Sequence, residues 1–468
     1  MDYSSRNRDS RACLCNLRIS NAVTERSILN TDDSCLRVPS KGTVYVENYG
    51  CTANVFDLEI MLAGLANGGY TITDHKESAD IILVNTCGVK KPTEDKILAR
   101  LSILSSFDKP LIIAGCLPKI DLEGIYRSAP SFSAAVDPHS VSRILEAVRD
   151  AEAGLKHRLF FSDRPEIKLL HPRARLNRFI EIIQVAEGCA GACSFCCVRF
   201  ARGRLLSYPK KLIVDRMRKA VSEGLREFWI TSQDNGAYGL DARSDLAELL
   251  KECCSVEGNF LIRVGMMNPG HALKILDRLI QVYTNRQIFN FLHLPVQSGD
   301  DEVLRRMSRF YSAEQFKRIV LAFRDKIPSI TLSTDVICGF PGETEDAFDR
   351  TVKLIEESKP DIVNISRFFP RPHTPAAEMD QLPPAEVKNR SRHLSKIVKR
   401  ISYERNRLWM GWDGSVLVDE KGERNTWIGR NSAYKPVVIE CEKNLLGESV
   451  DVHVTEAFPT YLRAEILD

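Results

Sequence analysis

The amino-acid sequence predicts an α/β protein with three folded parts, and three observations lead to this prediction. A chain of 468 residues is about long enough for three domains. Short apolar strands alternate with amphipathic helices in two separate runs, a pattern typical of parallel sheets covered by helices. Towards the C-terminus the pattern changes to short alternating segments broken by glycine and charged turns, which favours a small all-β, OB-like barrel.

Composition narrows the class of protein. Hydrophobic residues make up 44% of the chain and the net charge is +3, so sizeable cores are expected and any basic surface must be local. Fourteen cysteines are too few for a disulfide scaffold in a chain of this length. There is no secretory signal and no apolar run of the ~18 residues that a membrane span needs. We therefore expect a cytoplasmic protein, not bound to membranes, whose reduced thiols are free to bind metal.

The chain begins with residues 1–41, which are rich in serine, arginine, asparagine and aspartate and which we expect to form a disordered extension. Cys13, Cys15 and Cys35 lie there, but spacing alone is weak support for a metal site. Residues 42–155 follow as an N-terminal α/β domain. Its expected strands are 43–47, 80–85 and 111–114, and its expected helices are 57–65, 94–103 and 141–151.

Three cysteines of this domain, Cys51, Cys87 and Cys116, each follow one of the expected strands within a few residues. Ligands of open parallel sheets bind at the loops that follow the strands, so the three thiols are expected to meet at one edge. The alternative is three unrelated core cysteines, which fits poorly with a glycine beside each one. The sequence therefore predicts a candidate three-thiolate metal site.

Residues 156–177 are charged, hold scattered prolines and are predicted to be a linker. The second α/β run, residues 178–384, holds six strand–helix units and predicts a partial (β/α)₆ barrel. Its expected strands are 179–185, 227–231, 260–264, 289–294, 330–336 and 362–368.

The first strand of this barrel leads into a C-x₃-C-x₂-C loop formed by Cys189, Cys193 and Cys196. Barrel chemistry occurs at this end of the strands. Three thiolates on a short loop with glycines can hold one metal cluster, and the missing fourth ligand leaves an iron open to a small molecule. Buried apolar cysteines, or a zinc site with a distant histidine, remain the alternatives.

The last predicted parts are a basic helix, residues 385–407, and the small barrel, residues 408–468. The helix carries Lys396, Lys399 and Arg400, which fit either contacts to a phosphate backbone or an ordinary solvated face. The expected strands of the barrel are 415–418, 434–439, 449–454 and 460–466, about five with one more unassigned.

Taken together, these motifs resemble a known family. Cys189, Cys193 and Cys196, with Phe195, resemble the signature of radical S-adenosylmethionine (SAM) enzymes, and the second cysteine trio with the C-terminal (TRAM) barrel is similar to the methylthiotransferases. The motifs 231–239 and 371–377 are most similar to the archaeal and eukaryotic branch. That branch converts N6-threonylcarbamoyladenosine at position 37 of tRNA to its 2-methylthio derivative. Further matching motifs are 49–51, 84–87, 201–203 and 341–344.

The resemblance implies SAM and two [4Fe–4S] clusters as cofactors, one cluster on each trio. The cluster on the barrel trio would generate a 5′-deoxyadenosyl radical from SAM, and the cluster on the N-terminal trio would hold the sulfur to be transferred and methylated. The implied partners are tRNA, a low-potential electron donor of the ferredoxin or flavodoxin type, and a sulfur donor.

Further candidate residues follow from position after the strands and from the resemblance. Those expected to contact the cofactor are Phe195, Ser232, Gln233, Asp234, Gln297 and Asp335, and those expected to contact RNA are Arg202, Arg204, Arg371, Lys396, Lys399 and Arg400. Two residues depart from the family pattern: His373 replaces a common glycine, and Gln233 replaces a frequent acidic residue. Cys197 is an additional thiol for which packing is the expected role.

Other functions remain open at this stage. A methylthiotransferase of the same architecture could act on isopentenyladenosine or on a protein side chain. A non-catalytic iron–sulfur protein that binds RNA and senses redox state is a candidate of another class. The basic helix and the small barrel favour tRNA as substrate, and the intact radical motif with its six-unit barrel favours catalysis.

Overall fold

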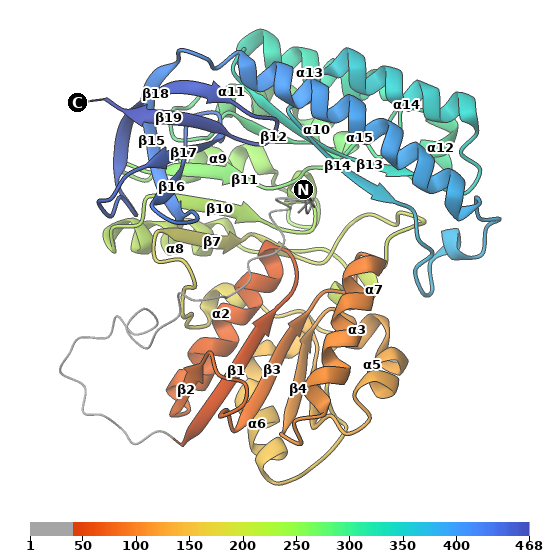
Figure 1. The fold of residues 1–468 in the computed structure, drawn as a ribbon, viewed down its shortest axis with the longest axis vertical. Helices are drawn as coiled ribbons and strands as arrows, with labels where there is room; N and C mark the ends of the chain where they lie inside the picture. The colour runs from red at the N-terminus through yellow and green to blue at the C-terminus, as the bar shows by residue number, and fades with distance from the viewer. Residues whose placement is uncertain (1–40, 468) are drawn as a thin grey trace, which may run out of the picture.

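The computed structural model of the protein describes residues 41–467, in which the three predicted folded parts are present (Figure 1). The expected extension 1–41, with Cys13, Cys15 and Cys35, lies outside the described residues except for Lys41. Within the described range no helix is both long enough and apolar enough to cross a membrane.

The N-terminal part is a six-stranded parallel sheet in the order β2-β1-β3-β4-β5-β6. The three predicted strands are present, and three more were not anticipated from the sequence. Helices α2 and α6 pack with one apolar cluster and α3 and α5 with the other, so both faces of the sheet are covered. The strands are β1 (Gly42–Asn48), β2 (Tyr70–Thr73), β3 (Ile81–Thr86), β4 (Leu111–Gly115), β5 (Ala134–Val136) and β6 (Arg158–Phe160). The helices are α2 (Thr52–Asn67), α3 (Lys91–Ser105), α4 (Leu117–Ile120), α5 (Leu122–Ser128) and α6 (Ile144–Glu152).

The predicted linker 156–177 is wrong in part. Residues 158–160 form β6, which pairs in parallel with β5 and completes the edge of the N-terminal sheet. Further along, Lys168 is fully buried between the first two parts of the protein. A charged stretch with prolines resembles a solvated connection in sequence, because nothing local reveals the buried partners of its charges.

The central part confirms the partial (β/α)₆ barrel. Two three-stranded parallel sheets, β11-β10-β7 and β12-β13-β14, are joined by a bridge between Ile262 and Ile288. The strands are β7 (Ile180–Gln184), β10 (Glu227–Thr231), β11 (Leu261–Val264), β12 (Phe291–His293), β13 (Thr331–Cys338) and β14 (Ile362–Arg367), with a short hairpin of β8 (Ala186–Glu187) and β9 (Leu206–Ser207). The helices are α7 (Val198–Arg202), α8 (Lys210–Ser222), α9 (Leu246–Cys253), α10 (Pro269–Lys274), α11 (Leu276–Tyr283), α12 (Asp301–Arg306), α13 (Ala313–Lys326) and α14 (Glu345–Ser358).

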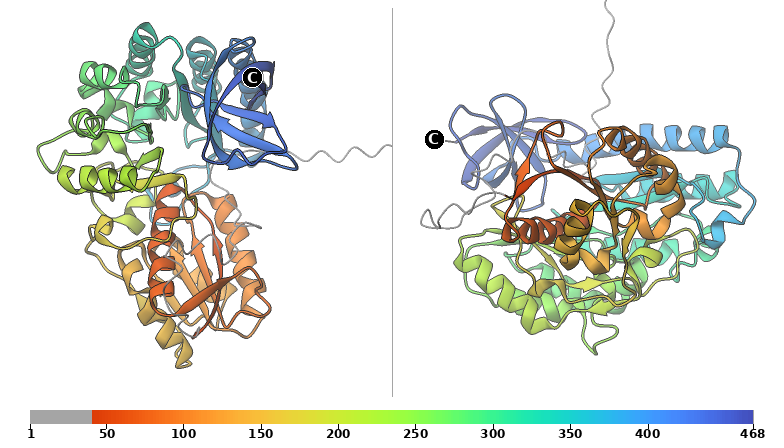
Figure 2. Two further views of the ribbon diagram at one scale, coloured as in Figure 1. Left: turned by 90° about the vertical axis from the view of Figure 1, so that its left-hand side faces the viewer. Right: turned by 90° about the horizontal axis from the view of Figure 1, so that it is seen from below.

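The C-terminal part is a closed barrel in the strand order β15-β16-β17-β19-β18, preceded by the long helix α15 (Pro384–Arg407). Figure 2 shows this small barrel beside the central one, and Phe289 and Tyr434 stack edge to face across the contact. The five strands confirm the predicted all-β barrel, with β16 as the strand that was not assigned. They are β15 (Asp413–Lys421), β16 (Thr426–Arg430), β17 (Pro436–Glu440), β18 (Ser449–Ala457) and β19 (Leu462–Ile466).

Candidate cluster and cofactor site

The carboxyl ends of β1, β3 and β4 face the central barrel (Figure 1), and one cysteine follows each of them. Cys51 begins α2, Cys87 follows β3, and Cys116 begins α4. The side-chain oxygen of Asn54 lies 3.6 Å from the sulfur of Cys51 and 3.8 Å from that of Cys116. Burial and, next, the nearby thiols of Cys116 and Cys51 together raise the pKa of Cys87 to about 12. The structure thus brings the three thiols of the N-terminal trio together.

The barrel trio is held on a loop whose path depends on one glycine, Gly188. Gly188 has a φ of +73°, and a Cβ there would overlap the backbone of Arg204. The backbone N–H of Gly191 donates to the Cys189 sulfur at 3.3 Å, and a Cβ on Gly191 would lie 3.4 Å from that sulfur. The loop therefore wraps closely around its own thiols.

The trio loop is also fixed to the rest of the barrel. The Ser194 hydroxyl donates to the carbonyl oxygen of Arg306 at 2.7 Å, and the Ser194 N–H donates to that of Met307 at 3.1 Å. Burial raises the pKa of Cys196 to about 12, with the Cys193 thiol as the next cause, and burial raises that of Cys189 to about 11. The three thiols are therefore carried, partly buried, on one anchored loop.

Both trios fit an iron–sulfur cluster by their chemistry. Each offers only thiols, which are the ligands of such clusters, and each sits on loops that bring the sulfurs around a common space. Among residues 41–467, no three histidine, cysteine, aspartate or glutamate side chains are arranged to hold a single metal ion. A cluster differs in that each cysteine binds a separate iron. Positive irons would also favour the thiolate form that burial alone opposes.

Two polar side chains beyond β10 have a free, buried oxygen. Neither the Ser232 hydroxyl nor the Gln233 side-chain oxygen has a hydrogen-bond partner within the protein. Buried polar atoms are rarely left without partners, so both are suited to bind a ligand. Phe195, the aromatic residue of the cysteine loop, packs edge to face with Phe340.

Asp234 differs from the expectation that it is free to bind cofactor. One carboxylate oxygen accepts hydrogen bonds from the N–H groups of Gly236 (3.0 Å) and Asn268 (2.9 Å), and the other lies 2.7 Å from Nδ1 of His271. These partners fix the loop after β10, so Asp234 holds the neighbouring Ser232 and Gln233 in place.

The remaining two cofactor candidates are neighbours, since Gln297 follows β12 and Asp335 lies on the adjacent strand β13. Gln297 has a φ of +69° and its N–H donates to the carbonyl oxygen of Asp335 at 2.7 Å. The Asp335 carboxylate lies 3.3 Å from Nε2 of His293 and accepts from the Asn364 amide at 2.7 Å. Burial raises the pKa of Asp335, but His293 and Asn364 outweigh it and the pKa is lowered. His293 therefore has a defined partner, and Asp335 is held as a carboxylate.

One residue of the site was missed from the sequence. The Arg309 guanidinium lies 5.6 Å from the ring centre of Phe195 and close enough to Cys193 and Asp234 for their charges to raise its pKa against the effect of burial. Its Nε is buried without a partner. The only sequence signal is an arginine in the short turn after α12, which is too common to single out.

Two of the six expected RNA contacts are wrong. Arg202 is 1% exposed and bonded to Asp57 and Glu187, and Arg371 is 4% exposed and bonded to Glu94 and to the Gly88 carbonyl oxygen. Buried guanidiniums that are already paired do not present themselves to phosphates, so both have a structural role between the first two parts. The other four candidates are exposed, namely Arg204, Lys396, Lys399 and Arg400.

His373, which replaces a common glycine, and Cys197, the additional thiol, both lie near this contact and both have a structural explanation. His373 adopts a φ of +62°, which favours glycine, and its ring packs edge to face against Phe200. Cys197 is buried and its thiol lies 3.4 Å from the carbonyl oxygen of Gly88, next to Cys87. Cys197 therefore packs in the contact between the two cysteine loops.

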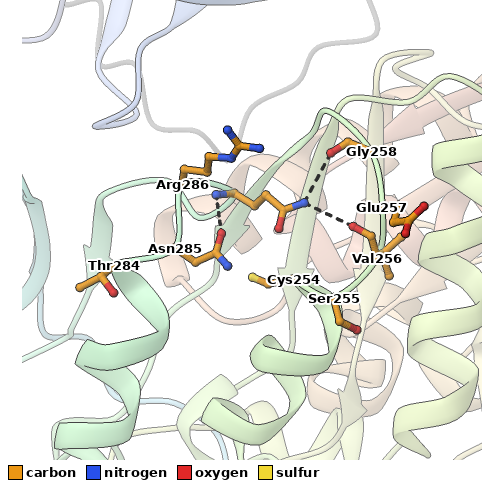
Figure 3. A pocket seen from close by; sticks show the side chains of 9 residues that line it. Cys254, Ser255, Val256, Glu257, Gly258, Thr284, Asn285 and Arg286 are labelled. Atoms are coloured by element: carbon orange, nitrogen blue, oxygen red, sulfur yellow. Dashed lines mark hydrogen bonds between the residues drawn. The ribbon is translucent and has the colours of Figure 1, made fainter.

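A separate surface depression is lined by residues 254–258 and 284–287 (Figure 3). It is formed by loops that follow α9 and α11 and precede strands of the barrel, whereas the cysteine loop follows a strand. The Gln287 amide donates to the carbonyl oxygens of Val256 and Gly258 at 3.4 and 3.5 Å. The depression therefore opens at the opposite end of the barrel from the trios.

Comparison with known proteins agrees with this arrangement. Residues 183–355 match the radical SAM superfamily, residues 43–137 match the uncharacterized protein family UPF0004, and residues 415–467 match the TRAM domain. The radical SAM methyltransferase TsrM from Kitasatospora setae has a similar fold, with a TM-score of 0.52 and 16% identity over 72% of this chain and 75% of that one.

Relatives in sequence cover almost the whole described chain. A probable threonylcarbamoyladenosine tRNA methylthiotransferase from Pyrococcus horikoshii is 43% identical over 91% of this chain and 99% of its own length. The threonylcarbamoyladenosine tRNA methylthiotransferase of Homo sapiens is 35% identical over 93% of this chain and 76% of its own length. The chain therefore belongs to the threonylcarbamoyladenosine tRNA methylthiotransferases, a family of radical SAM proteins.

Proposed function

We propose that this protein converts N6-threonylcarbamoyladenosine at position 37 of tRNA to 2-methylthio-N6-threonylcarbamoyladenosine. The observation that carries the proposal is the pair of cysteine trios on facing loops of two parts of the protein. The contact between these loops is tight, because Arg371 donates to the carbonyl oxygen of Gly88 at 2.5 Å and the Cys197 thiol reaches the same oxygen. Sulfur insertion at an unactivated carbon needs a radical source and a sulfur source near one another, and two trios supply two such sites.

The proposed cofactors are SAM and two [4Fe–4S] clusters. Cys189, Cys193 and Cys196 would hold the first cluster, and the N-terminal trio of Cys51, Cys87 and Cys116 would hold the second. When bound, these groups supply a carbon-centred radical, a transferable sulfur and a methyl group.

The protein's own residues bind and orient. The free oxygens of Ser232 and Gln233 are acceptors for the amino group of SAM, with Asp234 fixing their loop through its bonds to Gly236 and Asn268. The Arg309 guanidinium lies over the ring of Phe195 and places a positive charge beside the cysteine loop. Gln297 and the Asp335 carboxylate, held by His293 and Asn364, offer polar contacts to the ribose or to the substrate nucleoside.

The proposed partners are tRNA, a low-potential electron donor of the ferredoxin or flavodoxin type and a sulfur donor, and the proposed compartment is the cytoplasm. Exposed Lys396, Lys399 and Arg400 on α15 and Arg204 near the cysteine loop are the basic groups offered to phosphates. The TRAM barrel follows α15 directly and would extend the same surface.

The test is mass spectrometry of tRNA nucleosides from a strain that lacks the protein. We expect the 2-methylthio derivative of threonylcarbamoyladenosine to disappear and the unmodified nucleoside to accumulate. Unchanged 2-methylthio content would refute the proposal. Loss of a methylthio group from isopentenyladenosine or from a protein side chain would instead support one of the other substrates.

A second measurement separates an enzyme from a redox sensor. Reconstituted protein is incubated with SAM and a strong reductant, and 5′-deoxyadenosine is quantified. We expect 5′-deoxyadenosine from the wild type and none from a Cys193→Ala variant. A wild type that binds iron and forms none would favour the sensor.

A further inference from the structure

Four charged side chains are buried between the two cysteine loops without being ligands of either trio. They are Asp57 from α2, Lys168 from the segment that the sequence predicted as a linker, Glu187 from β8 and Arg202 from α7, each at most 1% exposed. Arg202 bonds Asp57 at 2.7 Å and Glu187 at 2.9 Å. Lys168 bonds the same two carboxylates at 2.6 and 2.8 Å. Two cations and two anions therefore balance in a closed cluster.

Arg202 extends this charge cluster to the N-terminal trio. The guanidinium nitrogen that bonds Asp57 also donates to the side-chain oxygen of Asn54 at 3.1 Å. That oxygen lies 3.6 and 3.8 Å from the sulfurs of Cys51 and Cys116. The Asn54 amide donates to the carbonyl oxygen of Thr86, beside Cys87, at 2.8 Å, which fixes its orientation. The Asn54 N–H donates to the carbonyl oxygen of Cys51 at 2.9 Å, and the Thr86 carbonyl oxygen also accepts from the Cys116 N–H at 2.9 Å. Through backbone bonds that need no thiol proton, one arginine of the barrel is thus linked by one asparagine to all three cysteine loops of the other part.

The stability of the fold does not require such a cluster. Four buried charges lose their hydration, and well-packed apolar side chains of similar volume are often as stable. A buried charge is, however, effective at a distance of a few ångströms, because the protein interior screens it much less than water does. Charges and hydrogen bonds around the sulfurs of iron–sulfur clusters set their reduction potentials.

We propose that Arg202 is a positioning residue for the cluster of the N-terminal trio, orienting its loops through Asn54 and raising the reduction potential of the cluster with its fixed positive charge. Because a cluster on this trio is itself part of the proposed function, the role of Arg202 rests on that function. Reduction adds a negative charge to the cluster, so a nearby cation stabilises the reduced form. On the barrel side of the charge cluster, Glu187 lies two residues before Cys189 in the sequence. The charge cluster therefore connects the N-terminal trio to the barrel trio.

The test uses full-length protein in which Cys189, Cys193 and Cys196 are alanine, so that only the N-terminal trio can bind a cluster. In this parent, Arg202→Gln is compared with Lys168→Gln. Each variant removes one positive charge from the same pair of carboxylates, and only Arg202 also contacts Asn54. After reconstitution, the reduced fraction of the cluster is followed by electron paramagnetic resonance in a redox titration.

We expect Arg202→Gln to lower the ratio of reduced to oxidised cluster at fixed potential about tenfold, a shift of about 59 mV for a one-electron couple. Lys168→Gln should shift it clearly less. Equal shifts in the two variants, or none in Arg202→Gln, would overturn the role of Arg202 alone. A parent that binds no iron would overturn the second cluster together with it.

Asn54→Ala gives an independent readout that leaves all four charges in place, and it decides the matter if Arg202→Gln fails to fold. We expect the cluster of this variant to lose iron to a chelator several-fold faster than the parent, because the Asn54 side chain no longer ties Arg202 to the Thr86 carbonyl oxygen, which lies beside Cys87 and accepts from the Cys116 N–H. A rate equal to that of the parent would overturn the proposed link.

Discussion

The junction between the central barrel and the TRAM barrel contains two buried carboxyl groups, each of which has one oxygen without a hydrogen-bond partner. Glu227 of β10 and Asp419 of β15 are both buried. One Glu227 oxygen accepts from the Trp229 indole at 2.6 Å, and the other has no partner; Asp419 likewise has one oxygen bonded to Arg430, at 3.3 Å, and one free. Burial and, as the next cause, the charge of Asp419 together raise the pKa of Glu227 from 4.5 to about 8. Glu227 is therefore expected to be protonated in the folded protein near neutral pH.

This raised pKa makes a prediction about stability and pH. The folded state holds the proton more tightly than the unfolded state, so the contribution of Glu227 is fully present below pH 4.5 and is lost as the pH rises towards about 8. Each pH unit in this window corresponds to about 1.4 kcal/mol, so raising the pH from about 5.5 to about 8 should destabilise the junction by up to about 3 kcal/mol. Glu227→Gln retains an acceptor for Trp229 and removes the titration. It should match the wild type at about pH 4.5 and below, and its advantage over the wild type should grow by up to about 3 kcal/mol between about pH 5.5 and about pH 8.

Urea unfolding followed by tryptophan fluorescence measures this difference. The four tryptophans, Trp229, Trp409, Trp412 and Trp427, all lie in β10 or after the end of α15, so their emission reports on the junction. Glu442→Gln, an exposed carboxyl of the same small barrel, is the matched control and should change little at any pH. A difference between Glu227→Gln and the wild type that stays constant or shrinks as the pH rises would refute the reasoning.

Three further predictions concern the trios and the surface. Iron content should fall by about half, with sulfide in proportion, in the triple alanine variant of the N-terminal trio, because three thiolates hold each cluster; full iron content would contradict two clusters. Arg371→Gln should destabilise the contact between the first two parts by up to about 3 kcal/mol, because buried Glu94 then keeps only the partly exposed Lys91 as a cationic partner. Glu94→Gln in the same chain should restore part of the loss, and additive losses in urea unfolding would show that the two residues do not interact. Lys396→Glu combined with Lys399→Glu should weaken tRNA binding, and the slope of the log binding constant against log salt concentration should fall by about one unit for each lost phosphate contact. Lys353→Glu on α14, also exposed, is the control and should change neither. An unchanged slope in the double variant would exclude α15 from the RNA surface.

The sequence was sufficient for those features whose signal is local. Alternation of short apolar strands with helices defined both α/β parts, since the periodicity of each element is written in neighbouring residues. The C-x₃-C-x₂-C spacing placed three thiols on one loop. The N-terminal trio needed one further rule, that loops after parallel strands share an edge, and Cys51, Cys87 and Cys116 do lie at one edge.

Only the tertiary structure decided how the charged residues are used, because a charge is read as exposed unless its partner is known. Arg202 and Arg371 were expected at the RNA surface, but their carboxylate partners, Asp57 and Glu94, are far away in sequence and bury them in the contact between two parts. The role of Lys168 was missed because it lies in a stretch predicted to be a linker, and that of Arg309 because it lies in a short turn. Cysteine spacing and strand periodicity thus predicted two candidate cofactor sites, whereas long-range ion pairing determined how the two parts that carry them are held together.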